Sequence, residues 1–142
     1  MSEYVPSPRE FVANQVKRYE ESNGAEGTEL NGLACVIVTH RGQKTGATRK
    51  TPLMRVKAGD RYVLVASMGG APKNPVWVDN LRAHPEVTLR DRAEVLEVRA
   101  REVTDDAERA RFWMAAVEAF PPYAEYQTRT TRKIPVFVLE PR

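Results

Sequence analysis

The chain has 142 residues, of which 42% are apolar and 29% are charged. This length fits a single domain, and the composition is that of a globular protein rather than a disordered one. The sequence holds no apolar run of the roughly 20 residues that a membrane-spanning helix needs, and its start, MSEYVPSPRE, lacks the basic and apolar regions of a signal peptide. Cys35 is the single cysteine and stands in the apolar run LACVIV, so we expect a buried thiol in a reducing compartment. With only two histidines beside it, we expect no Cys/His metal site.

Positive charge is concentrated in one part of the chain. The formal net charge is +3, yet no acidic residue occurs between Glu29 and Asp60, and outside this window acidic residues outnumber basic ones. Such a local field attracts an anion, which could be a phosphorylated cofactor, a nucleic acid or an acidic lipid surface, and a solvated basic loop is the alternative. The six cations of the window are Arg41, Lys44, Arg49, Lys50, Arg55 and Lys57.

The first expected element is a helix near the N-terminus. Ser7 and Glu10 have the spacing of a capping box and Pro8 falls at the first helical position, so we expect the helix to open at Ser7. Asn23 and Gly24 should end it, and a glycine-rich connector follows. Its narrow apolar stripe consists of Phe11, Val12, Val16 and Tyr19.

Short runs rich in β-branched residues predict strands over most of the remaining chain. Residues 40–50 contain two glycines and are expected to be a loop, and Gly59 supplies the turn of a hairpin. The expected strands are 33–39, 53–57, 61–66, 87–90, 93–103 and 134–139.

Two further helices are expected between these strands. One starts at Asn74-Pro75 and ends before His84-Pro85, and the other is capped by Thr104 and has acidic residues in its first turn. Six short strands, hairpin-length loops and peripheral helices predict a mainly β (α+β) fold, namely a small antiparallel barrel. The buried face of the second helix should be Phe112, Trp113, Ala116, Val117 and Phe120, before Pro121-Pro122 ends it.

The segment HRGQKTGATRKTP combines four permanent cations with two glycines, which suits an anionic ligand. It is neither a P-loop nor a dinucleotide-binding fingerprint, since the spacing of its glycines matches neither pattern. A second segment, ASMGGAPKNP, leaves a strand through a Gly-Gly turn and enters a helix, so that Ser67 and free N–H groups could form a polar pocket. A third, FPPYAEY, places Tyr123 and Tyr126 on one helical face, where they either cover a flat ligand or pack into the barrel.

The side chains of familiar catalytic sites are missing. Ser67 lies in no nucleophile elbow, and His40 is a poor base because Arg41 and Lys44 beside it should depress its pKa. His84 is better explained as the end of a helix. If the protein is an enzyme, a bound cofactor should therefore carry the reaction.

Three longer segments, THRGQKTGATRKTPL, VASMGGAPKNPVWVDNLRAHPEV and AFPPYAEYQTRTTRKIPVFVLEP, together resemble the deazaflavin (F420)-dependent nitroreductase family of actinobacteria. The resemblance covers about residues 33–141. It implies a split β-barrel of the flavin- and deazaflavin-binding type over residues 29–142, with residues 1–28 as an N-terminal helix and connector. It also implies that reduced coenzyme F420 passes a hydride to a quinone or a nitroaromatic acceptor.

The resemblance assigns roles to individual residues. Ser67, Tyr123 and Tyr126 match residues at the substrate side, so they are the expected catalytic residues. Met54 and Phe120 stand where nitroreducing members have tyrosine, which disfavours nitroimidazole reduction. The expected cofactor-binding residues are Gln43, Lys44, Thr45, Arg49, Lys50, Thr51, Pro52, Leu53, Met54, Val65, Ala66, Ser67, Met68, Val76, Trp77, Val78, Asp79 and Asn80.

Two alternatives remain open at this stage: an FMN-dependent reductase on the same barrel, and a non-catalytic F420-binding protein. Nucleic acid is not an expected partner, because no aromatic residue interleaves with the basic window to stack on bases. We expect a cytoplasmic protein whose N-terminal helix either covers the barrel or touches the inner face of the membrane, and whose exposed barrel edge allows a homodimer.

Overall fold

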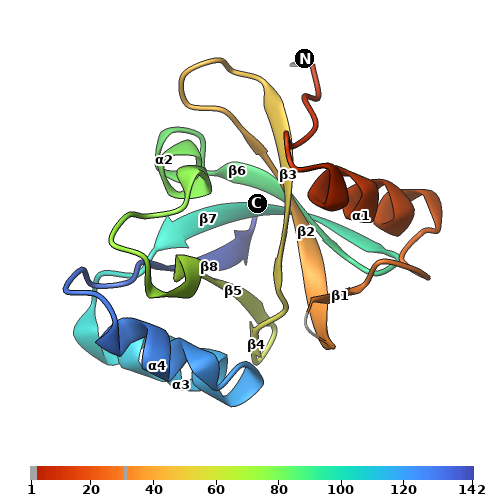
Figure 1. The fold of residues 1–142 in the computed structure, drawn as a ribbon. Helices are drawn as coiled ribbons and strands as arrows, with labels where there is room; N and C mark the ends of the chain where they lie inside the picture. Colours follow the sequence, from red (N-terminus) through yellow and green to blue (C-terminus); the bar gives the residue numbers. More distant parts are fainter. Residues whose placement is uncertain (1–2, 31) are drawn as a thin grey trace.

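One antiparallel sheet, curled around a hydrophobic core, forms the centre of the molecule in the computed structural model, which describes residues 3–30 and 32–142 (Figure 1). Asn31, in the expected connector, lies outside these residues. Within them no helix is long and apolar enough to cross a membrane. The strands are β1 (Glu29–Leu30), β2 (Leu33–Arg41), β3 (Thr48–Met54), β4 (Lys57–Ala58), β5 (Arg61–Val65), β6 (Glu86–Asp91), β7 (Glu94–Glu102) and β8 (Val136–Pro141). The helices are α1 (Glu10–Glu21), the short 3-10 helix η1 (Met68–Gly70), α2 (Val76–Ala83), α3 (Asp106–Ala119) and α4 (Pro122–Thr128).

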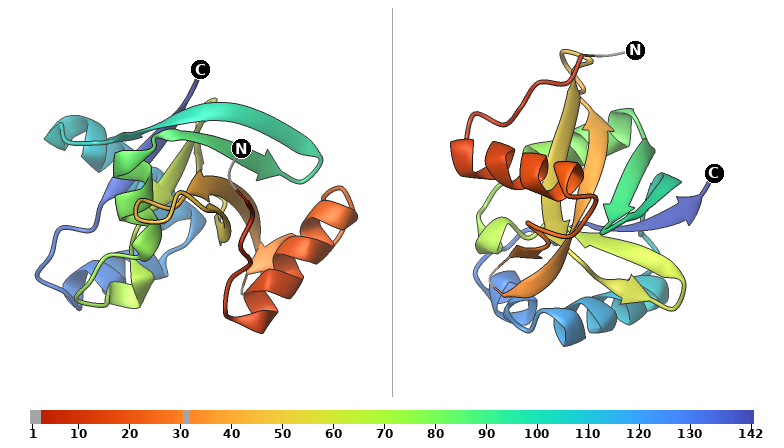
Figure 2. Two further views of the ribbon diagram at one scale, coloured as in Figure 1. Left: turned by 90° about the horizontal axis from the view of Figure 1, so that it is seen from above. Right: turned by 90° about the vertical axis from the view of Figure 1, so that its right-hand side faces the viewer.

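The strands are ordered β1-β2-β6-β7-β8-β5-β4, and β3 pairs with β2 at one edge. Neighbouring strands in this order run antiparallel. Figure 2 shows how β6 and β7 bend over the core, while α3 and α4 lie together below the sheet. The predicted fold class, mainly β with peripheral helices, is confirmed.

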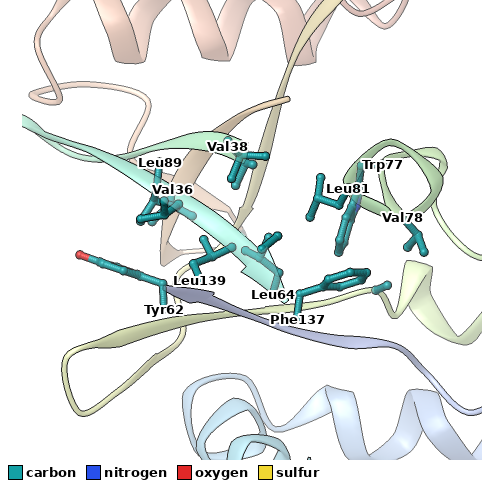
Figure 3. Close-up of a cluster of buried hydrophobic side chains, with 14 residues drawn as sticks. Val36, Val38, Tyr62, Leu64, Trp77, Val78, Leu81, Leu89, Phe137 and Leu139 are labelled. Atoms are coloured by element: carbon teal, nitrogen blue, oxygen red, sulfur yellow. The ribbon is translucent and has the colours of Figure 1, made fainter. Parts of the chain in front are cut away.

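Three strands are buried on both faces, and this explains their continuous apolar sequences. In β5 and β8, Leu64 and Phe137 point into the curl of the sheet, whereas Val63 and Val138 pack against α3 and α4. Figure 3 shows the inner cluster, which α2 closes with the side chains of Trp77 and its neighbours.

The third of these strands, β2, is covered on its outer face by α1. Val16 and Tyr19 of the helix pack with Cys35 and Ile37 of the strand. The apolar stripe therefore covers the barrel at these two positions, whereas Phe11 is 68% exposed. Cys35 is buried as expected, and burial raises the pKa of its thiol to about 11.

The expected caps of the helices are displaced along the chain. The hydroxyl of Ser7 accepts a hydrogen bond from the N–H of Arg9, and α1 begins at Glu10. The side chain of Asn74 accepts from Arg132 instead of capping α2, whose N-cap is Pro75. Helix α3 is capped by the carboxylate of Asp105 rather than by Thr104.

The expectation of a loop over residues 40–50 is wrong. His40 and Arg41 end β2, β3 already begins at Thr48, and the connection between them is only 42–47. Pro52 makes this strand hard to recognise because proline cannot donate a hydrogen bond inside a sheet. It is tolerated since β3 is an edge strand with β2 as its strand partner. Correspondingly, the expected strand 53–57 is divided between the end of β3 and β4.

We predict that Tyr19→Phe destabilises the protein by about 1–3 kcal/mol, because it removes a buried hydroxyl that is hydrogen-bonded to backbone groups of two strands. That hydroxyl donates to the Cys35 carbonyl oxygen at 3.0 Å and accepts from the Arg92 N–H at 2.7 Å. Urea unfolding measures the change. Phe11→Ala on the exposed side of the same helix is the control and should stay within about 0.5 kcal/mol. Equal effects of the two substitutions would contradict the prediction.

Candidate functional site

A pocket of about 310 Å3 lies where β3, the end of β5, η1, the start of α2 and α4 meet. Larger hollows exist, such as one of about 620 Å3 beside α1, but that one is lined mainly by polar residues of α1 and of 25–29. The smaller pocket combines apolar and aromatic walls with few polar groups, as small-molecule sites do. It is lined by Leu30, Pro52, Leu53, Met54, Val65, Ser67, Met68, Pro75, Trp77, Phe120, Tyr123 and Tyr126.

The pocket gathers nine of the twenty site residues predicted from the sequence, including all three expected catalytic residues. Pro52, Leu53 and Met54 are consecutive in a strand, so their side chains alternate between its two faces. All three nevertheless line the pocket, so the pocket must lie along the edge of β3, where both faces of the strand are reached. Leu30 was not among the predicted site residues, because its position in a short strand carried no signal of a site. Pro75 ends the singled-out segment ASMGGAPKNP but was not itself predicted as a site residue.

The other predicted site residues lie outside the pocket. Ala66 and Val78 are fully buried in the core, whereas Val76 is 79% exposed. Asp79 is exposed and near Arg82. The remaining predicted residues are Gln43, Lys44 and Thr45 in the β2–β3 loop, Arg49, Lys50 and Thr51 in β3, and Asn80 in α2.

The segment after Ser67 has a strained backbone. Met68, Gly69 and Gly70 have φ values of +47°, +65° and +81°, a left-handed conformation that is unfavourable for a residue with a side chain such as Met68. At Gly70 a Cβ atom would lie 2.6 Å from the Tyr126 carbonyl oxygen, so η1 packs tightly on α4. The segment therefore places Ser67 and Met68 beside the tyrosines of α4. Ser67 is 7% exposed, and its hydroxyl has no hydrogen-bond partner within 3–30 and 32–142.

The tyrosines of α4 form the aromatic wall of the pocket. Pro121 and Pro122 separate α3 from α4. Tyr123 directly follows them, and Tyr126 lies one turn further along the helix, with the two ring centroids 6.3 Å apart. Phe120 packs edge-on to Tyr123 at 4.9 Å. Burial, and then the neighbouring Tyr126, raise the pKa of Tyr123, so its hydroxyl stays protonated and can donate a hydrogen bond.

The basic window is less positive than its sequence indicates. Lys50 forms an ion pair with Glu20 of α1 at 2.7 Å, and Arg55 forms one with Asp91 at 2.9 Å. Two of the six cations of the window are therefore neutralised by acidic partners that are distant in sequence, one in a helix and one in a strand. Lys44 is exposed and forms no ion pair in the described part of the chain.

A chain of hydrogen-bonded polar groups, centred on the buried side chains of His40 and Asn80, links the β2–β3 loop to α2. The Gln43 N–H donates to Oδ1 of Asn80 at 2.8 Å, and the Asn80 amide lies 3.2 Å from Nδ1 of His40. Since the first contact identifies the oxygen of the amide, its Nδ2 donates to His40 Nδ1, and Nε2 of the neutral ring donates to Thr51 Oγ1 at 2.8 Å. Burial, followed by the charge of Arg49, lowers the pKa of His40 to about 4. The expected lowering is confirmed, but its expected cause, Arg41 and Lys44, is corrected.

The site has the features needed for a flat redox ring with an acidic tail. Apolar and aromatic walls with the hydroxyls of Ser67, Tyr123 and Tyr126 suit the ring and its acceptor. Helix α2 connects the pocket with the cationic β2–β3 loop. Its Trp77 lines the pocket, and Asn80, three residues later, accepts a hydrogen bond from the loop. Fold and site define a split-barrel protein of the flavin- and deazaflavin-binding type.

The comparisons with known proteins give the family. The family model of F420H(2)-dependent quinone reductases matches residues 11–141, and the chain belongs to this family. An F420H(2)-dependent quinone reductase of Mycobacterium tuberculosis is 38% identical over 127 residues, which cover 87% of this chain and 85% of that protein. The expectation of an F420H2-dependent oxidoreductase with coenzyme F420 as its cofactor is thus confirmed.

Solved structures agree with this assignment. The structure of an F420-H2 dependent reductase (FDR-A) has a TM-score of 0.70 and 50% sequence identity, covering 75% of this chain and 93% of that chain. A second structure, described as a domain-swapped dimer, has a TM-score of 0.74 and 44% identity, covering 94% of this chain and 100% of that one. The expected split β-barrel is confirmed.

We predict that stability falls as the pH decreases from 6.5 to 4, because of His40. The unfolded chain takes up a proton on this residue near pH 6.5, whereas the folded protein does so only near pH 4. Above pH 6.5 the free energy of unfolding contains the whole contribution of His40. As the pH falls from 6.5 to 4, this free energy decreases by about 3 kcal/mol. Urea unfolding at several pH values measures the fall. It should flatten in His40→Gln and persist in the control His84→Gln, and an unchanged fall in His40→Gln would contradict the assignment.

We predict that Gly70→Ala destabilises the protein by roughly 2–4 kcal/mol, through backbone strain and a clash with α4. Gly59→Ala is the matched control. Gly59 also has a positive φ, of +66°, but a Cβ atom there would meet nothing within 4 Å. It should cost only about 1 kcal/mol. Thermal unfolding compares the two variants, and similar losses would show that the packing of η1 on α4 is not restrictive.

Proposed function

We propose that the pocket between β3, η1 and α4 is where a quinone acceptor meets the reactive ring of coenzyme F420, and that the β2–β3 loop binds the acidic tail of the coenzyme. The observation that carries this proposal is the convergence of Ser67, Tyr123 and Tyr126 on one aromatic pocket. The reduced coenzyme supplies the hydride when it is bound.

The hydroxyls of the pocket bind and orient the acceptor. Ser67 has no competing partner among the residues described, and the raised pKa of Tyr123 keeps its phenol protonated. Both can therefore donate hydrogen bonds to a quinone oxygen, which becomes more negative during reduction. The apolar walls exclude water and strengthen these hydrogen bonds. Met54 and Phe120 add no hydroxyl to the pocket, which favours a quinone over a nitroaromatic acceptor.

The tail is bound by the cations that the fold leaves available. Lys44 is exposed, and Arg49 is held by the carbonyl oxygens of Val5 and Pro6 at 3.1 and 3.2 Å without loss of its charge. The Asn80 and His40 side chains support the loop from behind. Gln43, Thr45 and Thr51 would contribute polar contacts near the tail.

Location and assembly belong to the same proposal. The buried thiol supports a cytoplasmic protein, and exposed Phe11 and Val5 on and before α1 would provide a peripheral contact at the inner face of the membrane. The relative described as a domain-swapped dimer supports a homodimer. We also keep the division into residues 1–28 and 29–142 as a proposal, although α1 shares a buried cluster with β2.

The proposal is tested by titrating F420 into the purified protein and then following anaerobic oxidation of F420H2 by menadione. We expect F420 to bind and menadione to be reduced. Binding without turnover of any quinone would leave a cofactor-binding protein, and a yellow protein that releases flavin on denaturation would favour the FMN alternative.

We predict that Lys44→Gln weakens F420 binding about tenfold at low salt, because it removes an unpaired cation near the tail. The difference from wild type should shrink towards 1 M salt, where the Debye length is about 3 Å. The matched control is the double variant Glu20→Gln/Lys50→Gln, which removes an ion pair at constant net charge and should bind within about twofold of wild type. Equal losses in the two variants would contradict the assignment of the tail to this loop.

A further inference from the structure

Arg132 connects four points of the chain segment that leads from β5 to α2. Its Nε donates to the Ala71 carbonyl oxygen at 2.8 Å, and its Nη2 donates to that of Ser67 at 2.7 Å. Its Nη1 donates to the Ala66 carbonyl oxygen at 3.1 Å and to Oδ1 of Asn74 at 2.8 Å. One rigid guanidinium group thus bridges residues on both sides of the strained turn.

The charge of this guanidinium is not neutralised within the described ranges 3–30 and 32–142. All four of its acceptors are uncharged oxygens, and burial without an acidic neighbour lowers its pKa. Its position is set by Gln127 of α4, which donates to the Arg132 carbonyl oxygen at 2.8 Å and accepts from the Ile134 N–H at 3.0 Å. The guanidinium is therefore held in place by hydrogen bonds to uncharged oxygens rather than by an ion pair.

The segment that Arg132 bridges also lines the pocket, through Ser67 and Met68. Met68, Gly69 and Gly70 are left-handed, and such strained backbone persists only where surrounding contacts hold it. Hydrogen bonds to the carbonyl oxygens of Ala66 and Ser67 also polarise the same two peptide groups, whose N–H groups belong to Ser67 and Met68. Arg132 thereby contacts the backbone on both sides of Ser67, and Ser67 and Met68 both line the pocket.

We propose that Arg132 is a positioning residue of the quinone reductase site: its guanidinium group holds the Ser67–Gly70 turn so that the Ser67 hydroxyl reaches the acceptor. The inference rests on the proposed function of the pocket. If Arg132 acts through Ser67, its effect on kcat should disappear when the serine hydroxyl is absent.

The test is a double-variant cycle of Arg132→Lys and Ser67→Ala, measured as kcat and KM for menadione with F420H2. Lysine keeps the positive charge but cannot bridge several carbonyl oxygens at once. We expect Arg132→Lys to lower kcat at least tenfold while F420 affinity changes less than threefold. In the Ser67→Ala background, Arg132→Lys should lower kcat less than twofold, because residues that act together are not additive.

Controls separate this role from a general loss of folding. Lys133→Met removes the neighbouring charge, which pairs with Asp106 on the surface, and should keep kcat within twofold of wild type. Should Arg132→Lys unfold, Arg132→Ala with added guanidinium chloride is the second variant. Recovery of kcat at millimolar guanidinium, but not at equal ammonium chloride, supports the proposal.

Three results would overturn the inference: unchanged kcat in Arg132→Lys, equal losses in both Ser67 backgrounds, or equal rescue by ammonium. Failure of the proposed function is distinguishable, since the wild-type protein itself would then not oxidise F420H2 with menadione. In that case amide hydrogen exchange of residues 67–71 still tests the bridge. Faster exchange in Arg132→Lys than in Lys133→Met supports it, and equal exchange refutes it.

Discussion

Burial of β2 on both faces is the constraint on which the site depends. Val36 and Val38 face the inner cluster, while Cys35 and Ile37 face α1. A strand enclosed in this way has little freedom, so the hairpin partner β3 is held at a defined edge. That edge supplies Pro52, Leu53 and Met54 to the pocket, and the loop between the two strands carries the free cation Lys44. Core packing thus fixes the positions of the pocket wall and of the loop to which the proposed function assigns the two parts of the coenzyme.

The distribution of charge follows from the same packing. Helix α1 brings Glu20 to Lys50, and the end of β6 brings Asp91 to Arg55. Neither pair can be read from a local window of sequence, because the partners are 30 and 36 residues apart. Among the described residues, the attraction for an anion is left to the four cations of the window that form no ion pair, and it is therefore weaker than the composition indicates.

Much of the fold could be predicted from local patterns, and the errors have identifiable physical causes. The alternation of apolar and polar residues in β7 and the apolar run of β8 predicted these two strands. The paired prolines predicted the helix break before α4. The strand β3 was missed because Pro52 and many polar side chains conceal an edge strand. In the site, local patterns singled out Ser67 and the two tyrosines, and the family resemblance gave their expected roles. Arg132 carried no signal, since its role arises from acceptors about 60 residues away in the chain.

The orientation of the β3 backbone has a consequence for association with other chains. The Thr48 N–H donates to the Glu3 carbonyl oxygen, and the Thr48 carbonyl oxygen accepts from the Val5 N–H, so the backbone groups of Thr48 point away from β2. By the alternation of a strand, those of residues 50, 52 and 54 point the same way. At position 52 a proline therefore leaves a carbonyl oxygen but no donor, and an incoming strand would lose a hydrogen bond in the middle of its register. The imino acid that lines the pocket also discourages this edge from recruiting a foreign strand into a growing aggregate.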